Sequence, residues 1–459
     1  MKNKKWIVAK QNPKLSRIIS DKLNISSTTA QVLINRGINS DIEAESFLNP
    51  SLFDLPSPFL MKGMQDAVDR LKEAVYSREK IAIYGDYDVD GVTGTSLLYN
   101  FLKFLNADII YYNPDRFKEG YGINKDAIKN LKDEGVKLIV SVDCGITAFE
   151  EVEYAKGIGI DFIITDHHEP PGIMPPAVSV LNPHQEGCKY PGKEIVGVGV
   201  VFNLTLAMRR VLRDEGYFKK SEPNLGDYLD LVALGTVADC APLINVNRVV
   251  VSEGLKRMEN PKRIGLKALK EVSGIKADVS SYDLGFKLGP RINAMGRMGS
   301  ACEAVELFIS DEYGYASELA HKLNSENNNR QNTEKDILES AIKMADSDEY
   351  FINSNSVVLS SGEWHQGVIG IVASRIAERY QKPAFLIAVD ENGMGKGSGR
   401  SIDGINIYKA LCECQKILEN FGGHELAAGI TIKEDKIPIF REMFSKALEE
   451  YPAMNTKKL

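Results

Sequence analysis

A strand, an acidic loop and a helix follow one another over residues 80–105, KIAIYGDYDVDGVTGTSLLYNFLKFL. The short apolar run IAI is typical of a buried parallel strand, and the apolar residues after the loop repeat at helical spacing. Three carboxylates, Asp86, Asp88 and Asp90, stand at alternate positions between the two elements. In open α/β sheets the ligand site lies beyond the carboxyl ends of the strands. The stretch therefore predicts an α/β fold with an acidic site at that edge of the sheet.

Three carboxylates this close repel one another unless a cation holds them, and Mg²⁺ or Mn²⁺ takes oxygen ligands. The string D-x-D-x-D-G also opens a calcium-binding EF-hand loop. That loop needs a glutamate at its twelfth position, where this chain has Leu97, and a helix rather than a strand before it. A solvated acidic turn is the remaining alternative. Acids at the ends of other strands would favour the metal site over that turn.

Such acids follow. The apolar run VKLIVSV ends at Asp143, and the run DFIIT ends at Asp166, with His167 and His168 directly after it. A helical apolar stretch, DYLDLVALGTVA, ends at Asp239. The solvated-turn interpretation would have to hold independently for each of four elements, whereas one shared metal site explains them together. Carboxylate and imidazole ligands in combination suit Mn²⁺.

Length and composition restrict the class of protein. A chain of 459 residues predicts two or three domains. We expect a cytoplasmic protein with no membrane association, because no apolar stretch is long enough to span a bilayer and the N-terminus MKNKKWIVAKQ lacks a secretion signal. The six cysteines show no C-x-x-C spacing, which argues against structural zinc. The net charge of −7 argues against a large basic nucleic-acid surface.

The pattern of apolar residues also predicts the domain order. Helical stripes dominate the N-terminus, apart from a proline-broken connector, AESFLNPSLFDLPSPFL. A long polar helix is predicted near residues 312–346, followed by strand and helix signals that indicate a second, smaller α/β domain. We expect a helical N-terminal lobe over 1–75, a catalytic domain over 76–311, a connecting helix over 312–349 and a substrate-binding domain over 350–459.

Four segments, GDYDVDGVTGT, SVDCGIT, TDHHEP and ALGTVADCAPL, resemble the four motifs of the DHH phosphoesterases. Others are similar to segments of the RecJ family, bacterial exonucleases specific for single-stranded DNA: PRINAMGRM, LNSENNNRQ, WHQGVIGIVASR, GSGRS, FGGHELAAG and the N-terminal RGINSDIEAESFLNP. The resemblance covers nearly the whole chain. It implies a parallel-sheet DHH domain joined by a long helix to a smaller α/β DHH-associated domain. Typical members also carry a C-terminal OB-fold, which we do not expect within these 459 residues.

The resemblance also implies a site that holds two divalent cations, with Mn²⁺ expected and Mg²⁺ as the alternative. Asp143 would lie between the cations, and His168 would hydrogen-bond the phosphate as the second catalytic residue. Asp166 would either orient the histidines or merely end its strand. The metal ligands implied by the motifs are Asp86, Asp88, Asp90, Asp143, His167 and Asp239.

Substrate contacts are implied for three groups of residues. GMGKGSGRS is either a phosphate cradle or a flexible hairpin on composition alone, and the resemblance favours binding of the terminal 5′ phosphate by Ser398, Arg400 and Arg116. A second glycine-rich segment offers Gly423 and His424. A third, PRINAMGRM, is interpreted as a loop that lines the cleft or as a solvated basic turn; it carries Arg291 and Asn293.

The function implied is a 5′–3′ exonuclease that hydrolyses phosphodiesters of single-stranded DNA by a two-metal mechanism in DNA repair and recombination. We expect a monomer whose partners are single-stranded DNA and a helicase or a single-strand-binding protein. One alternative is an oligoribonuclease or cyclic-dinucleotide phosphodiesterase of the same superfamily. The other is a non-catalytic nucleic-acid-binding scaffold, against which the intact acids of all four motifs argue.

Overall fold

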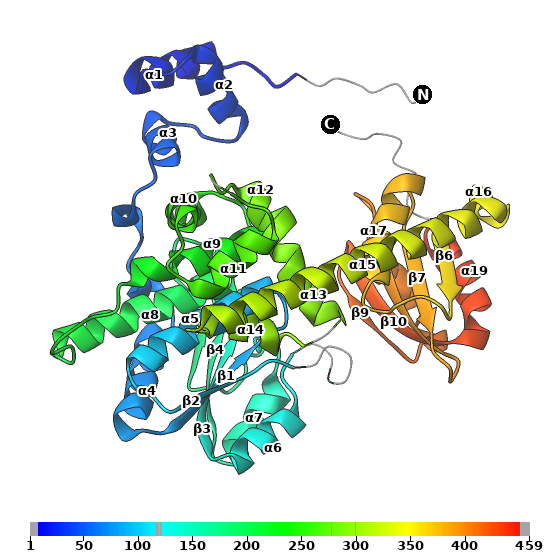
Figure 1. Cartoon of the computed structure of the whole chain (residues 1–459). Coiled ribbons are helices and arrows are strands. Elements are labelled where there is room, and N and C mark those ends of the chain that lie inside the picture. The colour runs from blue at the N-terminus through cyan, green and yellow to red at the C-terminus, as the bar shows by residue number, and fades with distance from the viewer. Residues whose placement is uncertain (1–7, 115–118, 120–121, 277, 299, 450–459) are drawn as a thin grey trace. The chain divides into compact units, whose positions relative to one another are not determined.

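The computed structural model describes residues 8–114, 119, 122–276, 278–298 and 300–449. The chain divides into two compact units, one formed by Ala9–Asn327 and the other beginning at Asn328 (Figure 1). The division falls inside the long helix α15 (Tyr313–Ser347), where a connecting helix is predicted. Within the described ranges, no helix combines the length and apolar character needed to cross a membrane.

The first unit is built on a five-stranded sheet in the order β2-β1-β3-β4-β5. Every neighbouring pair is parallel, which confirms the predicted parallel sheet. Parallel neighbours need crossover connections, and helices supply most of them. The strands are β1 (Lys80–Gly85), β2 (Ile109–Tyr112), β3 (Val136–Val142), β4 (Asp161–Thr165) and β5 (Ser179–Leu181).

Helices cover both faces of this sheet, as an all-parallel sheet requires. Side chains alternate along β1, so that Ile81 and Ile83 join the core on one face and Ala82 and Tyr84 the core on the other. Figure 1 shows the first face covered by α4, α5 and α8 and the second by α6 and α7. Their bounds are α4 (Met64–Ser77), α5 (Val89–Phe104), α6 (Lys125–Asp133), α7 (Phe149–Gly157) and α8 (Gly197–Asp214).

A further group of helices packs beside α5. The apolar helix α9 (Leu229–Ala238) contacts α5, α8 and α10. The segment PRINAMGRM is α13, so its prediction as a loop or turn is wrong. A π-helical turn, η4, runs directly into α13, so the helical path continues through this Gly-Pro pair. The group also contains α10 (Asn245–Glu259), α11 (Ile264–Val272), α12 (Ser281–Asp283), η4 (Leu284–Leu288), α13 (Gly289–Met298) and α14 (Cys302–Ile309).

Three N-terminal helices, α1 (Pro13–Leu23), α2 (Ser27–Asn35) and α3 (Asp41–Leu48), form a small core of their own. The predicted proline-broken connector begins too early, because its first residues lie in α3. The Ser40 hydroxyl accepts a hydrogen bond from the Glu43 N–H at 3.1 Å and starts that helix. Two short turns, η1 (Leu52–Asp54) and η2 (Pro58–Leu60), make up half of the remaining connector.

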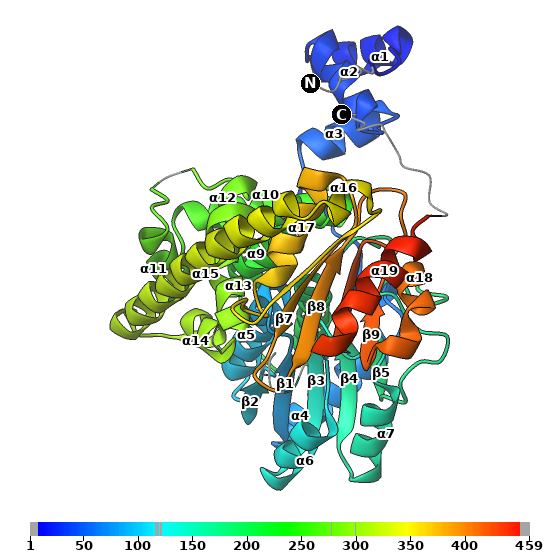
Figure 2. The same cartoon turned by 90° about the vertical axis from the view of Figure 1, so that its right-hand side faces the viewer.

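The second unit contains a mixed sheet in the order β6-β7-β8-β10-β9. Figure 2 shows α17 on one side of this sheet and α18 and α19 on the other. The strands are β6 (Val357–Ser361), β7 (Ala384–Val389), β8 (Met394–Arg400), β9 (Asn420–Gly423) and β10 (Ala427–Lys433). The helices are α16 (Tyr350–Asn353), α17 (Ile369–Tyr380), α18 (Ile407–Glu413) and α19 (Ile437–Ala447).

Residues MGKGSGR of the glycine-rich segment form β8, the central strand of this sheet, and are not a flexible hairpin. Its glycines alternate with Lys396, Ser398 and Arg400, so they share one face of the strand. A Cβ on Gly399 would lie 2.3 Å from the Phe385 ring, so this face admits no side chain. The glycines therefore serve close packing, and the three polar side chains project from the opposite face.

Within the second unit, a buried carboxylate joins two helices. Glu334 of α15 is 4% exposed; its Oε2 lies 2.7 Å from Arg330 Nη1, and its Oε1 pairs with Arg375 of α17. Glu334→Ala should destabilise this unit by about 3–5 kcal/mol, because it leaves a desolvated guanidinium without its counter-charge. Urea unfolding measures the loss. The control Glu339→Ala removes an exposed carboxylate of the same helix and should leave the midpoint almost unchanged. Equal effects of the two changes would contradict the prediction.

Candidate metal centre

Three acids lie together because each stands one residue beyond its strand. The N–H of Asp86 donates to the Val142 carbonyl at 3.1 Å, and that of Asp143 to the Thr165 carbonyl at 2.9 Å. The N–H of Asp166 donates to the Leu181 carbonyl at 3.0 Å. The pattern of backbone hydrogen bonds between strands thus continues one residue past β1, β3 and β4, and it places the three carboxylates at one edge of the sheet.

The acidic loop turns tightly into α5. Asp88 is the N-cap residue, and its Oδ1 accepts hydrogen bonds from the N–H groups of Asp90 at 2.8 Å and Gly91 at 3.1 Å. A Cβ on Gly91 would lie 2.5 Å from the Asp86 carbonyl oxygen, so the turn requires glycine there. The loop thereby places Asp86 and Asp88 next to each other at the start of the helix.

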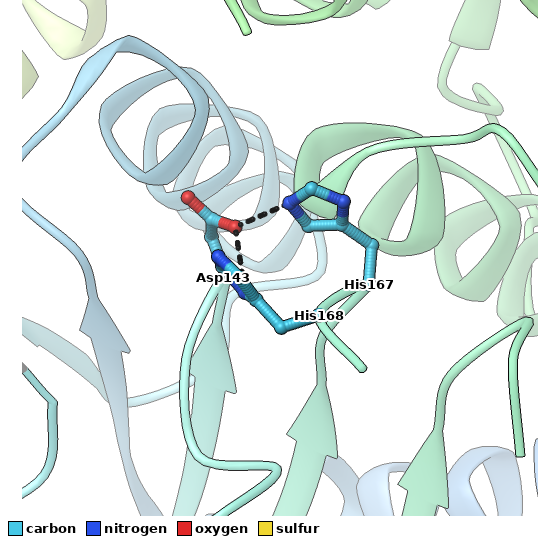
Figure 3. A group of neighbouring side chains, drawn as sticks. All are labelled: Asp143, His167 and His168. Atoms are coloured by element: carbon cyan, nitrogen blue, oxygen red, sulfur yellow. Dashed lines mark ion pairs between the residues drawn. The ribbon is translucent and has the colours of Figure 1, made fainter. Parts of the chain in front are cut away.

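Asp143 has an unusual backbone and an unusual environment. Its φ of 60° is in the left-handed region, which aspartate and asparagine tolerate better than most residues. The side chain is 3% exposed, and among the residues that the structure describes its Oδ1 finds no hydrogen-bond donor. That oxygen lies 3.1 Å from His167 Nε2 and 3.9 Å from His168 Nδ1, and Figure 3 shows it facing both rings. A buried carboxylate oxygen in this state suits a bound cation.

All six predicted metal ligands lie in this one region. His167 Nε2 is 3.8 Å from Asp90 Oδ2 and 3.8 Å from Asp239 Oδ2. Asp143 belongs to two of the groups of neighbouring donor atoms, as expected for a ligand between two cations. Atoms within 4.8 Å of one another define three groups: Asp86, Asp88 and Asp143; Asp90, His167 and Asp239; Asp143, His167 and His168.

The electrostatics of the cluster match this donor set. Burial, followed by neighbouring carboxylates, raises the pKa of Asp90 and of Asp143 well above the ordinary value. Burial and Asp88 raise the pKa of Asp239 to about 6. Burial and the neighbouring His168 lower the pKa of His167 to about 4, so its imidazole is neutral at pH 7 and offers a ligand nitrogen. The raised pKa values show that the protein alone does not stabilise these carboxylates as anions. Bound divalent cations would stabilise them, and the neutral imidazole supplies a further ligand.

Asp166 holds the second histidine. Its Oδ1 lies 2.7 Å from His168 Nδ1 and accepts hydrogen bonds from the N–H groups of His167 and His168, while its Oδ2 accepts one from Ile146. Although burial alone would raise it, the pKa of Asp166 is lowered by these donors. The hydrogen bond to Asp166 raises the pKa of His168 to about 9. His168 is therefore cationic at neutral pH, and its side chain is 46% exposed.

The structure reveals supporting residues that the sequence did not indicate. Asn182 donates from Nδ2 to the His168 carbonyl at 2.8 Å, and Asn113 donates to the Asp86 carbonyl at 2.7 Å. Asp90 accepts hydrogen bonds from the backbone N–H groups of Gly197 and Val198 at the start of α8. The only signal for this last contact is the glycine-spaced start of a long apolar run, VGVGVVF.

The predicted substrate residues of the first unit have varied surroundings. Arg116 lies outside the described residues. Asn293 accepts a hydrogen bond from the Val89 N–H at 3.2 Å, which ties α13 to the start of α5 beside the acidic loop. Arg291 donates to the Lys287 carbonyl of η4 at 2.7 Å and to Asn324 Oδ1 of α15 at 3.0 Å. Neither contact tests a role in substrate binding.

In the second unit, Ser398 and Arg400 lie side by side. Arg400 Nη1 donates to Ser398 Oγ at 3.2 Å. A Cβ on Gly370 would lie 2.9 Å from Ser398 Oγ and 3.2 Å from Arg400 Nη2, so both side chains adjoin the first turn of α17. Gly423 ends β9, and the N–H of the exposed His424 donates to the Ala427 carbonyl at 2.8 Å. A hydroxyl, a guanidinium and a helix N-terminus thus stand together.

Comparison with known proteins gives consistent matches. The family described as "DHH family, N-terminal domain" matches residues 80–236, and the "DHHA1 domain" matches residues 353–450. The single-stranded-DNA-specific exonuclease RecJ of Bacillus subtilis is 40% identical over 444 residues, which cover 96% of this chain and 55% of that relative. RecJ of Escherichia coli is 39% identical over 403 residues, which cover 85% of this chain and 70% of that relative. The chain thus spans about half the length of the first relative and about two thirds of the second.

Solved structures agree. RecJ from Thermus thermophilus in complex with Mn²⁺ superposes with a TM-score of 0.83 at 32% identity, over 97% of this chain and 62% of that one. The same protein in complex with Mg²⁺ gives a TM-score of 0.76 at 30% identity, over 97% and 60%. At this identity and coverage, the chain belongs to the RecJ family of single-stranded-DNA-specific exonucleases.

Proposed function

We propose that this protein is a metal-dependent 5′–3′ exonuclease that hydrolyses phosphodiesters of single-stranded DNA. The observation that carries the proposal is the convergence of six carboxylate and imidazole side chains at one sheet edge, with Asp143 shared between groups. Membership in the RecJ family supports the substrate and the reaction. The polarity of degradation and a role in repair and recombination rest on the family alone.

The donor groups divide naturally between two cations. Asp86 and Asp88 would hold one, Asp90, His167 and Asp239 would hold the other, and Asp143 would touch both. The metal-bound structures of the Thermus thermophilus relative support Mn²⁺ or Mg²⁺. When bound, such a pair activates water at neutral pH and offsets the charge on the scissile phosphate.

His168 would contact the phosphate directly. Its Nδ1 is held by Asp166, which sets the orientation of the ring, and the cationic imidazolium would donate to a phosphate oxygen. Because Asp166 is 1% exposed and accepts three backbone N–H groups, the support behind the ring is rigid. His168 would therefore stabilise the negative charge that develops as the phosphodiester breaks.

The Ser398–Arg400 pair would bind the terminal 5′ phosphate, because helix N-termini and guanidinium groups favour phosphate oxygens. Arg116, Gly423, His424, Arg291 and Asn293 stay predicted substrate contacts. The other expectations from the sequence also stay predictions: the four-part division of the chain, a helicase or single-strand-binding partner, a monomeric state and a cytoplasmic location.

One assay tests the proposed function against its rivals. The purified protein is incubated with Mn²⁺ and with end-labelled single-stranded DNA, duplex DNA, a short RNA or a cyclic dinucleotide. We expect 5′-mononucleotides from single-stranded DNA and none after chelation of the metal. Preference for the short RNA or the cyclic dinucleotide would favour the superfamily alternative. Binding of DNA without cleavage of any substrate would favour the scaffold.

Arg400→Ala should weaken the use of 5′-phosphorylated single-stranded DNA more than that of 5′-hydroxyl DNA. A charge-assisted contact to phosphate corresponds to a rise in KM of about 10- to 100-fold. Steady-state kinetics on the two substrates measures the difference. Lys396→Ala, at an exposed position of the same strand face, is the matched control. Equal losses on both substrates would show that Arg400 contacts the DNA backbone in general or stabilises the protein fold, and does not recognise the 5′ phosphate.

A further inference from the structure

The first turn of α8 holds Asp90 by both of its oxygens. The Gly197 N–H donates to Asp90 Oδ2 at 2.6 Å, and the Val198 N–H donates to Asp90 Oδ1 at 2.8 Å. Asp90 is 1% exposed, so backbone amides rather than water supply hydrogen bonds to this carboxylate. The N-terminus of an 18-residue helix also favours negative charge at this point.

The packing around Asp90 leaves no room for a side chain at Gly197. A Cβ there would lie 2.9 Å from Asp90 Oδ2, 2.7 Å from Asp143 Cβ and 3.0 Å from Asp143 Cα. Since two of these atoms belong to Asp143, whose backbone is held in the β3–β4 ladder, the clash cannot be relieved by moving one flexible side chain.

A second glycine, Gly235 of α9, packs against the other side of Asp90. A Cβ on Gly235 would lie 2.5 Å from Thr93 Oγ1 and 3.0 Å from Asp90 Oδ1. Helices α5, α8 and α9 therefore meet around the Asp90 carboxylate, with glycine at the two closest contacts. This packing restricts Asp90 to one orientation, in which Oδ2 lies 3.8 Å from His167 Nε2.

We propose that Gly197 is a positioning residue of the metal centre. Its N–H and that of Val198 fix the Asp90 carboxylate toward His167 and Asp239, and its missing Cβ allows Asp90 and Asp143 to approach each other. Residues that support metal ligands typically change metal affinity when they are altered. This inference rests on the proposed two-cation function and extends it to α8, which carries none of the predicted ligands.

The test compares Gly197→Ala with Gly199→Ala. The control adds the same methyl group to the same helix, where it would meet only the side chain of Ile195, at 3.2 Å. Mn²⁺ affinity is measured by isothermal titration calorimetry, and the metal-free fold by circular dichroism and Tm. We expect Gly197→Ala to lower the metal-free Tm relative to the control, because its methyl group clashes with Asp143, and to weaken Mn²⁺ binding by the folded protein by about 10- to 100-fold, whereas the control should keep its affinity. A folded Gly197→Ala protein with unchanged Mn²⁺ affinity would overturn the inference.

A readout on the unaltered protein covers the case in which Gly197→Ala does not fold. Hydrogen exchange is measured with and without Mg²⁺ at the amides of Gly197 and Val198 and, as a reference, in the first turn of α4. Cation binding at Asp90 should slow exchange at the α8 amides several-fold more than in α4. Equal changes in both helices would overturn the inference. Failure of the unaltered protein to bind Mn²⁺ or Mg²⁺ would instead contradict the proposed function itself.

Discussion

Asp143→Asn is expected to remove nuclease turnover while the protein stays folded. The loss should be on the order of 10³-fold, equivalent to about 4 kcal/mol, because one carboxylate that serves both cations becomes a neutral amide. Asparagine tolerates the left-handed backbone at this position, where φ is 60°, so the substitution adds no strain. Nuclease assays and circular dichroism on the same preparation measure the two effects.

The same variant has a second expected signature. Without metal its Tm should equal or exceed that of the unaltered protein, because burial and neighbouring carboxylates disfavour the charge on Asp143. Addition of Mn²⁺ should raise the Tm of the variant less than that of the unaltered protein, because fewer ligands bind the cation. Asp133→Asn, at an exposed position of the same unit, is the control for loss of one negative charge. Near-normal turnover by a folded Asp143→Asn protein would contradict the two-cation assignment.

The second large effect is expected for His168→Ala. Turnover should fall by about 10²- to 10³-fold, because a preorganised cationic donor to the phosphate is lost. Mn²⁺ affinity should stay close to that of the unaltered protein, since His168 is expected to contact the substrate and not the cations. Kinetics on single-stranded DNA and calorimetric titration with Mn²⁺ separate these quantities.

His321→Ala is the matched control for that experiment, because it removes an exposed histidine from α15. It should change neither turnover nor Mn²⁺ affinity. A parallel loss of Mn²⁺ affinity in His168→Ala would instead make His168 a ligand, a role that its group with Asp143 and His167 also permits.

The metal centre was predictable from sequence because its signals are local. Each of Asp86, Asp143 and Asp166 directly follows a run of residues suited to a buried strand, and parallel strands place their carboxyl ends at one edge. Neither step needs a long-range contact to be known. The order of elements, the parallel sheet and the convergence of the six candidate ligands could therefore be inferred from the chain alone.

Glycine and proline have opposite meanings in different surroundings, so the sequence left the conformation of one segment open and predicted that of another wrongly. The alternate glycines of β8 suggest a loop when taken alone, but the Phe385 ring occupies the space that a side chain at Gly399 would fill. In α13, the Gly-Pro pair suggests a turn, but η4 carries the helical path directly into it. For β8 the deciding feature is a side chain of the neighbouring strand. For α13 it is the conformation of the backbone that precedes the segment.

Only the tertiary structure identifies the support of Asp90. The donors are the backbone N–H groups of Gly197 and Val198, more than a hundred residues away, and every residue except proline carries such a group. A backbone amide therefore leaves no mark in the sequence that would assign it to one carboxylate. The sequence by itself determined which side chains hold charge at the sheet edge, whereas the packing of α5, α8 and α9 decided how one of those charges is oriented.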